Sequence, residues 1–181
     1  MLIKRVENGL MAEKNSAFVA FYTEPVKIYD EEDSLPESLW NMEIQLLGAI
    51  LRWDGSLGLV GGEVEPGESL VDAAIRESYE EIGYEPTEDM LKLICSHNMV
   101  SVNRKQNTHL FACKVSRLQL YEIRVRSCNS RHSQVESAGF NILHMNPQTL
   151  ENLPGMLWAG TALNEVKILL EQGIIAPVSQ G

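Results

Sequence analysis

The sequence predicts an α/β fold, in which a mixed β-sheet packs against a few helices. Strand-like runs rich in β-branched and aromatic residues alternate along the chain with segments of helical periodicity. With 181 residues, of which 44% are hydrophobic, the chain is long enough to bury a sizeable core. No repeat or low-complexity linker interrupts it, so we expect one domain over residues 1–181. Its parts are an N-terminal strand and acidic loop (1–42), a core (43–146) and C-terminal helices (147–175).

The first half of the chain is expected to be mostly strands. The run from Ala17 to Thr23 is almost entirely apolar, which is typical of a buried strand, and the acidic, proline-containing segment 24–40 follows as a loop. Asp54-Gly55 is a strong signal for a two-residue hairpin turn. The turn joins two expected strands, which cover residues 43–53 and 57–60, and Gly61-Gly62 is expected to end the second one.

Residues 69–82 carry the clearest helical pattern. Apolar or small residues recur there at positions i, i+3, i+4, i+7 and i+11, namely Val71, Ala74, Ile75, Ser78 and Ile82. Gly83 follows where a helix often ends in a left-handed residue. In the second half we expect strands over 90–99, 108–116 and 139–145, and helices over 118–125, 147–153 and 160–172.

Composition excludes several classes of protein. The longest apolar stretch, Ile44 to Leu51, falls far short of the roughly 20 residues that a membrane-spanning helix needs, and no secretory signal is visible. Cys95, Cys113 and Cys128 form an odd set without C-x-x-C spacing, which favours reduced thiols in the core or in loops. The sequence therefore predicts a cytoplasmic protein with no membrane partner, and it leaves a nuclear location open.

Charge is divided unevenly along the chain, whose formal net charge is −10. Residues 24–89 hold 18 acidic and 3 basic side chains, whereas residues 92–131 hold 8 basic and 1 acidic. An acidic protein is usually a poor partner for nucleic acid. This distribution, however, allows a basic surface for phosphates beside an acidic centre.

Three carboxylates stand close together on the expected helix. Glu77, Glu80 and Glu81 lie at i, i+3 and i+4 and span about 100° of its surface, where like charges destabilise a helix unless something positive offsets them. Ten acidic residues share one base, Arg76, between positions 63 and 89, so a solvated face paired with lysines would lack its partners. Oxygen-only clusters suit Mg²⁺ or Mn²⁺, and the backbone at Gly61-Gly62 can add a carbonyl.

The same segment resembles the Nudix box, G-x5-E-x7-R-E-U-x-E-E-x-G-U. All seven fixed residues of the pattern are present, namely Gly62, Glu68, Arg76, Glu77, Glu80, Glu81 and Gly83. Ser78 stands where the pattern has a larger aliphatic residue. We expect it either to loosen the packing of the helix or to bond back to a helix carbonyl.

This resemblance implies a Nudix fold, an α/β/α sandwich with a mixed β-sheet between helices. It also implies a hydrolase that cleaves a nucleoside diphosphate linked to another group. Two or three Mg²⁺ or Mn²⁺ ions would be held by Glu77, Glu80, Glu81 and the Gly61 carbonyl, with Glu77 and Glu80 as catalytic residues. Glu68 and Arg76 would pair behind the ligands and set the geometry of the loop and the helix. The metals would neutralise phosphate oxygens and position a water for in-line attack.

A finer resemblance, over about residues 44–175, is to the U8 snoRNA-decapping and inosine-diphosphatase branch of this family. It rests on Arg52-Trp53-Asp54-Gly55, Leu57-Gly58, the run from Thr108 to Lys114, Glu136 ahead of Gly139, Leu153-Pro154, and Gly160 before the last helix. In that branch a loop glutamate at the position of Glu136 lies near the metals. Glu136 is therefore a candidate catalytic base or extra ligand, with a surface acid as the alternative and Glu122 as a weaker competitor.

The branch also implies substrate-binding residues. Arg52 matches an arginine that contacts the nucleotide, while Phe18 and Leu59 stand where a histidine and an aromatic residue hold the purine. Phe18 can stack on a base but cannot hydrogen-bond its edge, so a preference for hypoxanthine does not follow. Asn164, or Glu165 if the alignment shifts by one residue, approximates an amide position on the last helix. His109 lies among apolar residues, where a core histidine is at least as plausible as a ligand.

The basic stretch over 104–131 helps to distinguish a capped RNA substrate from a free nucleotide. Arg117, Arg124 and Arg131 are spaced by seven, and a capped RNA needs such phosphate contacts where a free nucleotide needs few. A solvated helix is the alternative for this stretch.

Our leading hypothesis is hydrolysis of purine nucleotides, such as inosine or guanosine phosphates, or of nucleotide-capped RNA ends (decapping). The alternative is a housekeeping pyrophosphatase for dinucleoside polyphosphates, nucleotide sugars or oxidised nucleotides. A non-catalytic nucleotide- or RNA-binding module is a remote third. The branch resemblance also suggests a homodimer.

Overall fold

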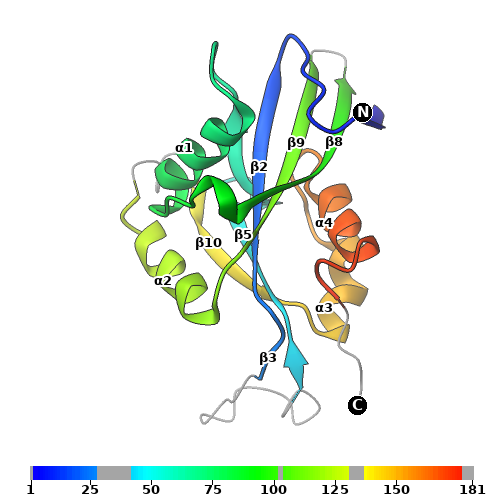
Figure 1. Cartoon of the computed structure of the whole chain (residues 1–181). Coiled ribbons are helices and arrows are strands. Elements are labelled where there is room, and N and C mark those ends of the chain that lie inside the picture. The colour runs from blue at the N-terminus through cyan, green and yellow to red at the C-terminus, as the bar shows by residue number, and fades with distance from the viewer. Residues whose placement is uncertain (1, 28–41, 102–103, 131–136, 177–181) are drawn as a thin grey trace.

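The computed structural model describes residues 2–27, 42–101, 104–130 and 137–176, with the backbone alone at 101, 104 and 105. Its larger sheet is mixed and lies between helices, with α1 and α2 on one face and α3 and α4 on the other (Figure 1). The strands are β1 (Leu2–Val6), β2 (Asn15–Tyr22), β3 (Val26–Lys27), β4 (Glu43–Ile44), β5 (Leu46–Arg52), β6 (Leu57–Gly58), β7 (Val60–Glu63), β8 (Leu91–Ser101), β9 (Arg104–Lys114) and β10 (Ser137–His144). The helices are α1 (Leu70–Ile82), α2 (Arg117–Ser127), α3 (Pro147–Asn152) and α4 (Ala162–Glu171), with short 3₁₀ turns at Glu88–Met90 and Leu153–Gly155.

The order of strands in the sheet explains where the site lies. The main path is β1-β8-β9-β2-β5-β10, and β2 runs parallel to β9, whereas the other pairings are antiparallel. The other edge of β2 is shared by two strands, because β7 pairs with residues 16–19 and β5 reaches only Tyr22. The sheet therefore divides beside Phe18, and both cavities described below border this division.

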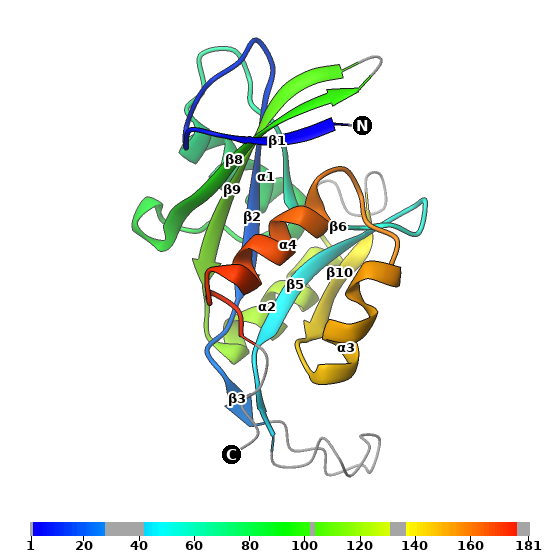
Figure 2. The ribbon, with the colours of Figure 1, turned by 90° about the vertical axis from the view of Figure 1, so that its right-hand side faces the viewer.

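The two faces of β2 build two separate cores. Ala17, Val19 and Phe21 join the core under α1 and α2, whereas Ala20 joins the core under α4, against which Phe18 and Tyr22 also pack. This alternation follows from the period of two along a strand. Figure 2 shows α4 and α3 lying across the sheet on the second face. The α/β/α sandwich expected from the sequence is confirmed.

Helix α1 has both of its ends marked by the sequence. The Ser69 side chain accepts a hydrogen bond from the Asp72 backbone N–H at 3.1 Å, which caps the first turn. Gly83 ends the helix with φ of 65°, and its N–H donates to the Tyr79 carbonyl. The Ser78 hydroxyl donates to the Ala74 carbonyl at 2.7 Å, so the back-bonding alternative for this departure from the box is confirmed.

One expectation about strands was wrong, and one strand was missed. Gly61-Gly62 does not end a strand but lies inside β7, because only a residue without Cβ can pass so close to Ala17 and Phe18 of β2. Strand β1 was not predicted at all. It is a largely exposed edge strand that pairs with β8, so its sequence shows no buried alternation.

Three further expectations concern the cysteines, the acidic loop and membrane-spanning helices. Cys95 and Cys113 are buried thiols, and Cys128 is exposed. Most of the expected acidic loop, residues 28–41, lies outside the described residues. Among the described residues, no helix combines the length and the apolar character required to cross a membrane.

Candidate active site

The three glutamates of the predicted metal site line one cavity of about 740 Å³, which we call the glutamate cavity. It lies between α1, β7 and the β5–β6 turn. Its lining is Arg52, Trp53, Asp54, Gly61, Gly62, Glu63, Glu65, Arg76, Glu77, Glu80 and Glu81. Six acidic side chains thus face two arginines, and a cation that entered would relieve their repulsion.

Arg76 donates hydrogen bonds to three glutamates and so fixes the positions of their carboxylates. Its Nε and Nη2 donate to the two carboxylate oxygens of Glu68 at 2.8 and 3.0 Å, a bidentate pair. Its Nη1 donates to Glu77 Oε1 at 2.8 Å and to Glu80 Oε2 at 3.1 Å. Hydrogen bonds from Arg76 lower the pKa of Glu68 although partial burial opposes this, and the pKa of Arg76 is raised, chiefly by Glu68. Glu68 and Arg76 therefore pair as expected, while their role in catalysis stays a prediction.

The two glycines of β7 allow α1 to approach the sheet. The Gly61 N–H donates to Glu81 Oε2 at 2.8 Å, which fixes the third glutamate against the strand. A Cβ on Gly62 would lie 2.5 Å from Glu77 Oε1. Glu77 and Glu81 are consequently both 8% exposed, with the carboxyl group of each close to the β7 backbone.

The donors in this cavity fit a divalent metal chemically. They are carboxylate and backbone oxygens, the ligands that Mg²⁺ and Mn²⁺ prefer. Within the described part of the chain, no group of three or more His, Cys, Asp or Glu side chains is already arranged as a metal site. The guanidinium of Arg76 lies between Glu77 and Glu80 instead, so a metal that entered would compete with it for both carboxylates.

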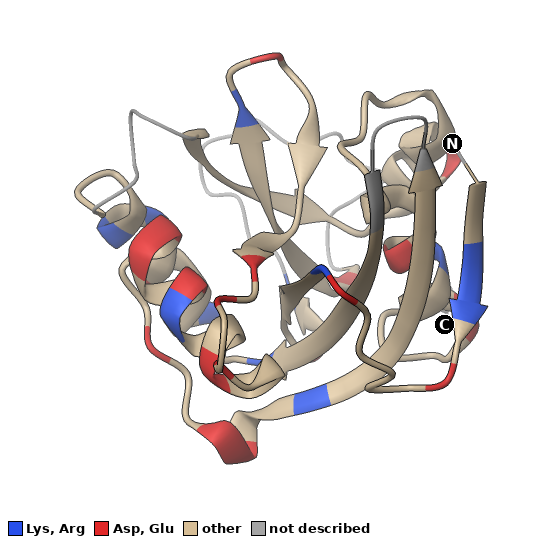
Figure 3. Ribbon diagram, turned by 90° about the horizontal axis from the view of Figure 1, so that it is seen from above, with Lys and Arg blue, Asp and Glu red and all other residues tan. Residues whose placement is uncertain are grey.

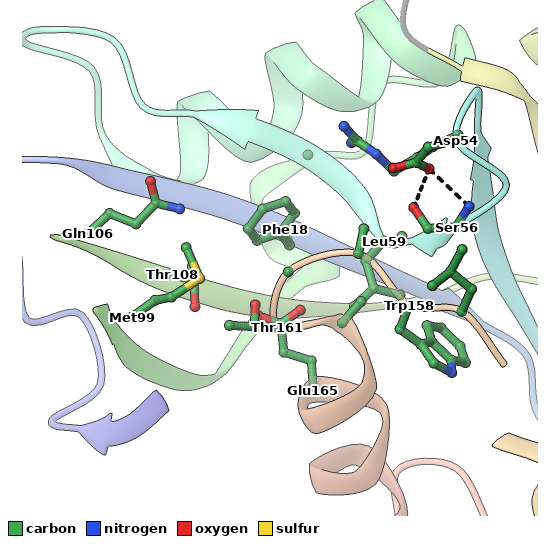
Figure 4. A pocket seen from close by; sticks show the side chains of 17 residues that line it. Phe18, Asp54, Ser56, Leu59, Met99, Gln106, Thr108, Trp158, Thr161 and Glu165 are labelled. Atoms are coloured by element: carbon green, nitrogen blue, oxygen red, sulfur yellow. Dashed lines mark hydrogen bonds between the residues drawn. The ribbon is translucent and has the colours of Figure 1, made fainter. Parts of the chain in front are cut away.

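A second cavity of about 420 Å³ lies on the α4 side of the sheet, and we call it the aromatic cavity (Figure 4). Phe18, Leu59 and Trp158 line it, and the role of Phe18 and Leu59 in holding a base stays a prediction. The other lining residues are Arg52, Asp54, Ser56, Gly58, Gly61, Met99, Gln106, Thr108, Leu157, Ala159, Gly160, Thr161, Ala162 and Glu165. An aromatic face with a few polar groups is typical of a small-molecule site.

The two cavities share part of their walls. Arg52, Asp54 and Gly61 line both, so a ligand with a flat apolar end and an anionic end can occupy the two together. Asp54 is held in the β5–β6 turn by the Ser56 N–H at 3.0 Å and the Ser56 hydroxyl at 2.6 Å. These hydrogen bonds lower the pKa of Asp54 and keep its carboxylate charged.

The floor of the aromatic cavity contains a buried acid, Glu165. Its side chain is 1% exposed, and the Thr161 hydroxyl donates to its Oε1 at 2.8 Å. Burial raises the pKa of Glu165 from 4.5 to about 7, and the hydroxyls of Thr161 and Thr108 oppose this rise. Glu165 therefore exchanges its proton near neutral pH.

Glu165→Gln is expected to stabilise the folded protein in alkaline solution. Because the folded-state pKa lies above 4.5, the folded chain keeps a proton that the unfolded chain releases, and stability falls as pH rises from about 4.5 through about 7. Denaturant unfolding at about pH 8 should show a gain of up to about 3 kcal/mol, which disappears near pH 4. The exposed Glu171→Gln on the same helix is the matched control, and a gain for Glu165→Gln that is equal at both pH values would contradict the assignment.

The structure places the other predicted residues as follows. Asn164 lies outside the lining of the aromatic cavity, and the alternative at that position, Glu165, lies inside it, because α4 turns its buried stripe toward the sheet. Glu136 lies outside the described residues, so its role stays a prediction. His109 is a fully buried core residue, whose Nδ1 is 2.8 Å from Ser96 Oγ, and burial lowers its pKa to about 4.

The basic stretch does not form one surface in the described part of the chain. Arg117 lies over the Tyr121 ring and reaches the Lys27 carbonyl, whereas Arg126, near the other end of α2, pairs with Glu122. The backbone of Arg104 lies in the β8–β9 hairpin, away from α2 (Figure 1). Lysines and arginines are spread over the molecule with acidic residues between them (Figure 3). Arg131 lies outside the described residues.

Two residues at the floor of the aromatic cavity, Glu165 and Thr108, are polar residues at positions where the sequence pattern is otherwise apolar. Glu165 occupies a position of the buried stripe of α4, whose other members are Ala162, Val166 and Leu169. An acid at such a position is costly unless it has a partner or a function. Thr108 shares its strand face with Leu110 and Ala112 and is likewise a polar residue among apolar ones.

The fold and the site define a protein of the α/β/α sandwich class with an acidic, oxygen-lined centre. Residues 46–132 match the NUDIX domain family. This segment, just under half of the chain, is therefore similar to a NUDIX domain.

Three known proteins illustrate the similarity. A U8 snoRNA-decapping enzyme from Homalodisca vitripennis is 32% identical over 80 residues, which is 42% of this chain and 42% of that protein, so less than half of the relative's length is matched. A mutT/nudix family protein from Listeria innocua superposes with a TM-score of 0.56 at 16% identity, over 90% of this chain and 94% of that one. The NUDIX domain of Shewanella oneidensis NrtR in complex with ADP ribose gives 0.55 at 14% identity, over 90% of each chain.

Proposed function

We propose that this protein is a divalent-metal-dependent hydrolase that cleaves a phosphoanhydride bond in a nucleoside diphosphate derivative. The observation that carries the proposal is the shared wall of the two cavities. A base that stacks on Phe18 in the aromatic cavity would extend its phosphates past Arg52 toward Glu77, Glu80 and Glu81. The chain thus offers a cavity with an aromatic wall for a base beside an acidic cavity for metals and phosphates.

Different residues of the site would bind the metal, bind the phosphates and act as the general base. Glu77, Glu80, Glu81 and the Gly61 carbonyl would hold the metal, which when bound neutralises phosphate oxygens and activates a water. Arg52, on the shared wall, supplies a positive charge for the phosphates. Arg76, anchored on Glu68, keeps Glu77 and Glu80 together when no cation is present. Glu136 remains the candidate general base.

Purine nucleotides and nucleotide-capped RNA ends are the substrates that we propose first. The size of the aromatic cavity and the face of Phe18 suit a purine base. Capped RNA is supported by the name of the Homalodisca relative, and not by a continuous basic surface. The NrtR complex adds ADP ribose as a compound to test, within the alternative of a broad-range pyrophosphatase.

A substrate panel tests the proposal directly. It contains inosine and guanosine di- and triphosphates, dinucleoside polyphosphates, a nucleotide sugar, ADP ribose and capped RNA, each with Mg²⁺, with Mn²⁺ or with a chelator. We expect metal-dependent cleavage at a phosphoanhydride bond, identified from product masses, with purine diphosphates or capped RNA turned over fastest. Tight binding without turnover of any compound would instead support the non-catalytic binding module.

A further inference from the structure

The floor of the aromatic cavity holds two polar side chains whose hydrogen-bonding capacity the protein does not fill. One is Glu165, whose carboxyl group is 1% exposed and accepts one hydrogen bond of good geometry, from the Thr161 hydroxyl at 2.8 Å. A carboxylate can accept about four hydrogen bonds. Among the described residues, no cation is close enough to shift the pKa of Glu165. Further donors for this carboxylate can therefore come from a ligand.

The second side chain is Thr108, which is 1% exposed and also lines the cavity. Its hydroxyl lies close enough to Glu165 to lower the pKa of that carboxyl group, but it forms no hydrogen bond of good geometry, and it is one of two such buried side-chain atoms among the described residues. The other is Nδ1 of His97, the cross-strand partner of Thr108, and His97 does not line the cavity. A buried polar group without a partner is costly, and it is tolerated where a ligand supplies the missing bond.

The two groups lie near one another and face the same space. Thr108 affects the pKa of Glu165, which places the hydroxyl near the carboxyl group. Phe18, on the neighbouring strand β2, lies above them, and the carboxyl group of Glu165 points from α4 toward this region (Figure 4). A flat ring that stacks on Phe18 would present its edge to Glu165 and Thr108.

Guanine supplies the edge that these groups require. Its N1–H and its 2-amino group are adjacent donors for the two oxygens of a carboxylate, and its 6-oxo group is an acceptor for a hydroxyl. Hypoxanthine lacks the 2-amino donor. Adenine presents an acceptor at N1, which a carboxylate repels.

We propose that Glu165 makes the aromatic cavity selective for guanine over hypoxanthine and adenine, and that Thr108 contacts the 6-oxo group of the bound base. This inference rests on the proposed function, which puts a nucleotide base in this cavity, and it names the base. It concerns recognition alone and requires no chemical step.

Binding of nucleoside monophosphates tests the inference without turnover, since these compounds contain no phosphoanhydride bond. Calorimetric titration at about pH 8, above the pKa of about 7, keeps Glu165 charged. We expect the wild-type protein to bind guanosine monophosphate at least about tenfold more tightly than inosine monophosphate, and adenosine monophosphate more weakly still. Equal affinities for the guanine and hypoxanthine compounds would overturn the inference.

Glu165→Gln changes the shape of the floor little and removes its charge. A neutral amide still pairs with N1–H and the 6-oxo group, which both bases possess, so the ratio of the two affinities should fall to about one. Glu171→Gln, an exposed substitution of the same kind on α4, should keep the wild-type ratio. A wild-type ratio in Glu165→Gln would overturn the inference.

Thr108→Val tests whether the hydroxyl contributes to base binding and not to the stability of the fold. Removing a buried hydroxyl that forms no hydrogen bond of good geometry should change the free energy of unfolding little. Affinity for guanosine monophosphate should nevertheless fall by about threefold to tenfold. Unchanged affinity would show that this hydroxyl does not contact the base.

The outcomes also distinguish this inference from the function on which it rests. A wild-type protein that hydrolyses guanosine and inosine diphosphates with equal kcat/KM refutes the selectivity and leaves the hydrolase standing. A protein that prefers guanosine monophosphate but cleaves nothing in the panel refutes the hydrolase and leaves the selectivity standing.

Discussion

Glu80→Gln should abolish metal-dependent hydrolysis while the protein stays folded. The Glu80 side chain is 15% exposed and lines the glutamate cavity with Glu77 and Glu81. An amide is a much weaker metal ligand than a carboxylate, and loss of the several kcal/mol that a metal contributes corresponds to at least about a thousandfold in rate. The amide oxygen can still accept from Arg76, and one of three like charges is gone, so stability should be unchanged or slightly higher.

Three measurements check this prediction. Initial rates at saturating Mg²⁺ give the loss of activity, Mn²⁺ titration gives the loss of metal affinity, and thermal unfolding gives stability. Glu85→Gln, an exposed acid just after α1 and outside the cavity lining, is the matched control and should behave as the wild type. Wild-type turnover in Glu80→Gln would remove this residue from the metal site.

Gly61→Ala should cost about 4 to 5 kcal/mol of stability, enough to unfold a large fraction of a marginally stable domain. Gly61 has φ of 142°, a conformation that residues with a Cβ rarely adopt. The added Cβ would also overlap the Ala17 carbonyl oxygen and lie 2.7 Å from Phe18 Cα, both of which are backbone atoms of β2 that cannot swing aside. Strand β7 would have to separate from β2, and with it the N–H that holds Glu81.

Gly139→Ala is the matched control for backbone strain. Gly139 has nearly the same φ, 140°, but nothing lies within 4 Å of the Cβ that the substitution would add. The strain alone should cost about 1 to 3 kcal/mol, and denaturant unfolding of both variants isolates the contribution of the overlap. Equal losses in the two variants would show that the close approach of β7 to β2 does not determine stability.

The acidic helix could be predicted from sequence because it depends on local spacing. Helical periodicity and the caps at Ser69 and Gly83 define α1 without reference to the rest of the chain. The spacing of Glu77, Glu80 and Glu81 alone puts three carboxylates on one sector of that helix. The position of the β5–β6 turn at Asp54-Gly55 was predictable in the same way, but the loop between Arg52 and Ser56 has three residues and not the two expected.

Strand pairing and burial could not be predicted in this way. Strand β1 is held by hydrogen bonds to β8, which lies about 90 residues further along, and nothing within residues 2–6 signals that pairing. The glycines of β7 suggested a strand end, whereas the close approach of β2 requires Gly61 and the Glu77 side chain lies against Gly62. Such features depend on contacts between distant segments, which local pattern does not contain.

The sequence by itself determined the fold class, the acidic helix and the oxygen-ligand chemistry of the site, because period, turns and residue type act locally. Only the tertiary structure decided that Arg76 clamps Glu77 and Glu80, and that the two cavities meet at Arg52 and Gly61. It also decided that Glu165, and not Asn164, faces the aromatic cavity. One residue along a helix turns a side chain by about 100°, and only the packing of α4 on the sheet selects which side chain points inward.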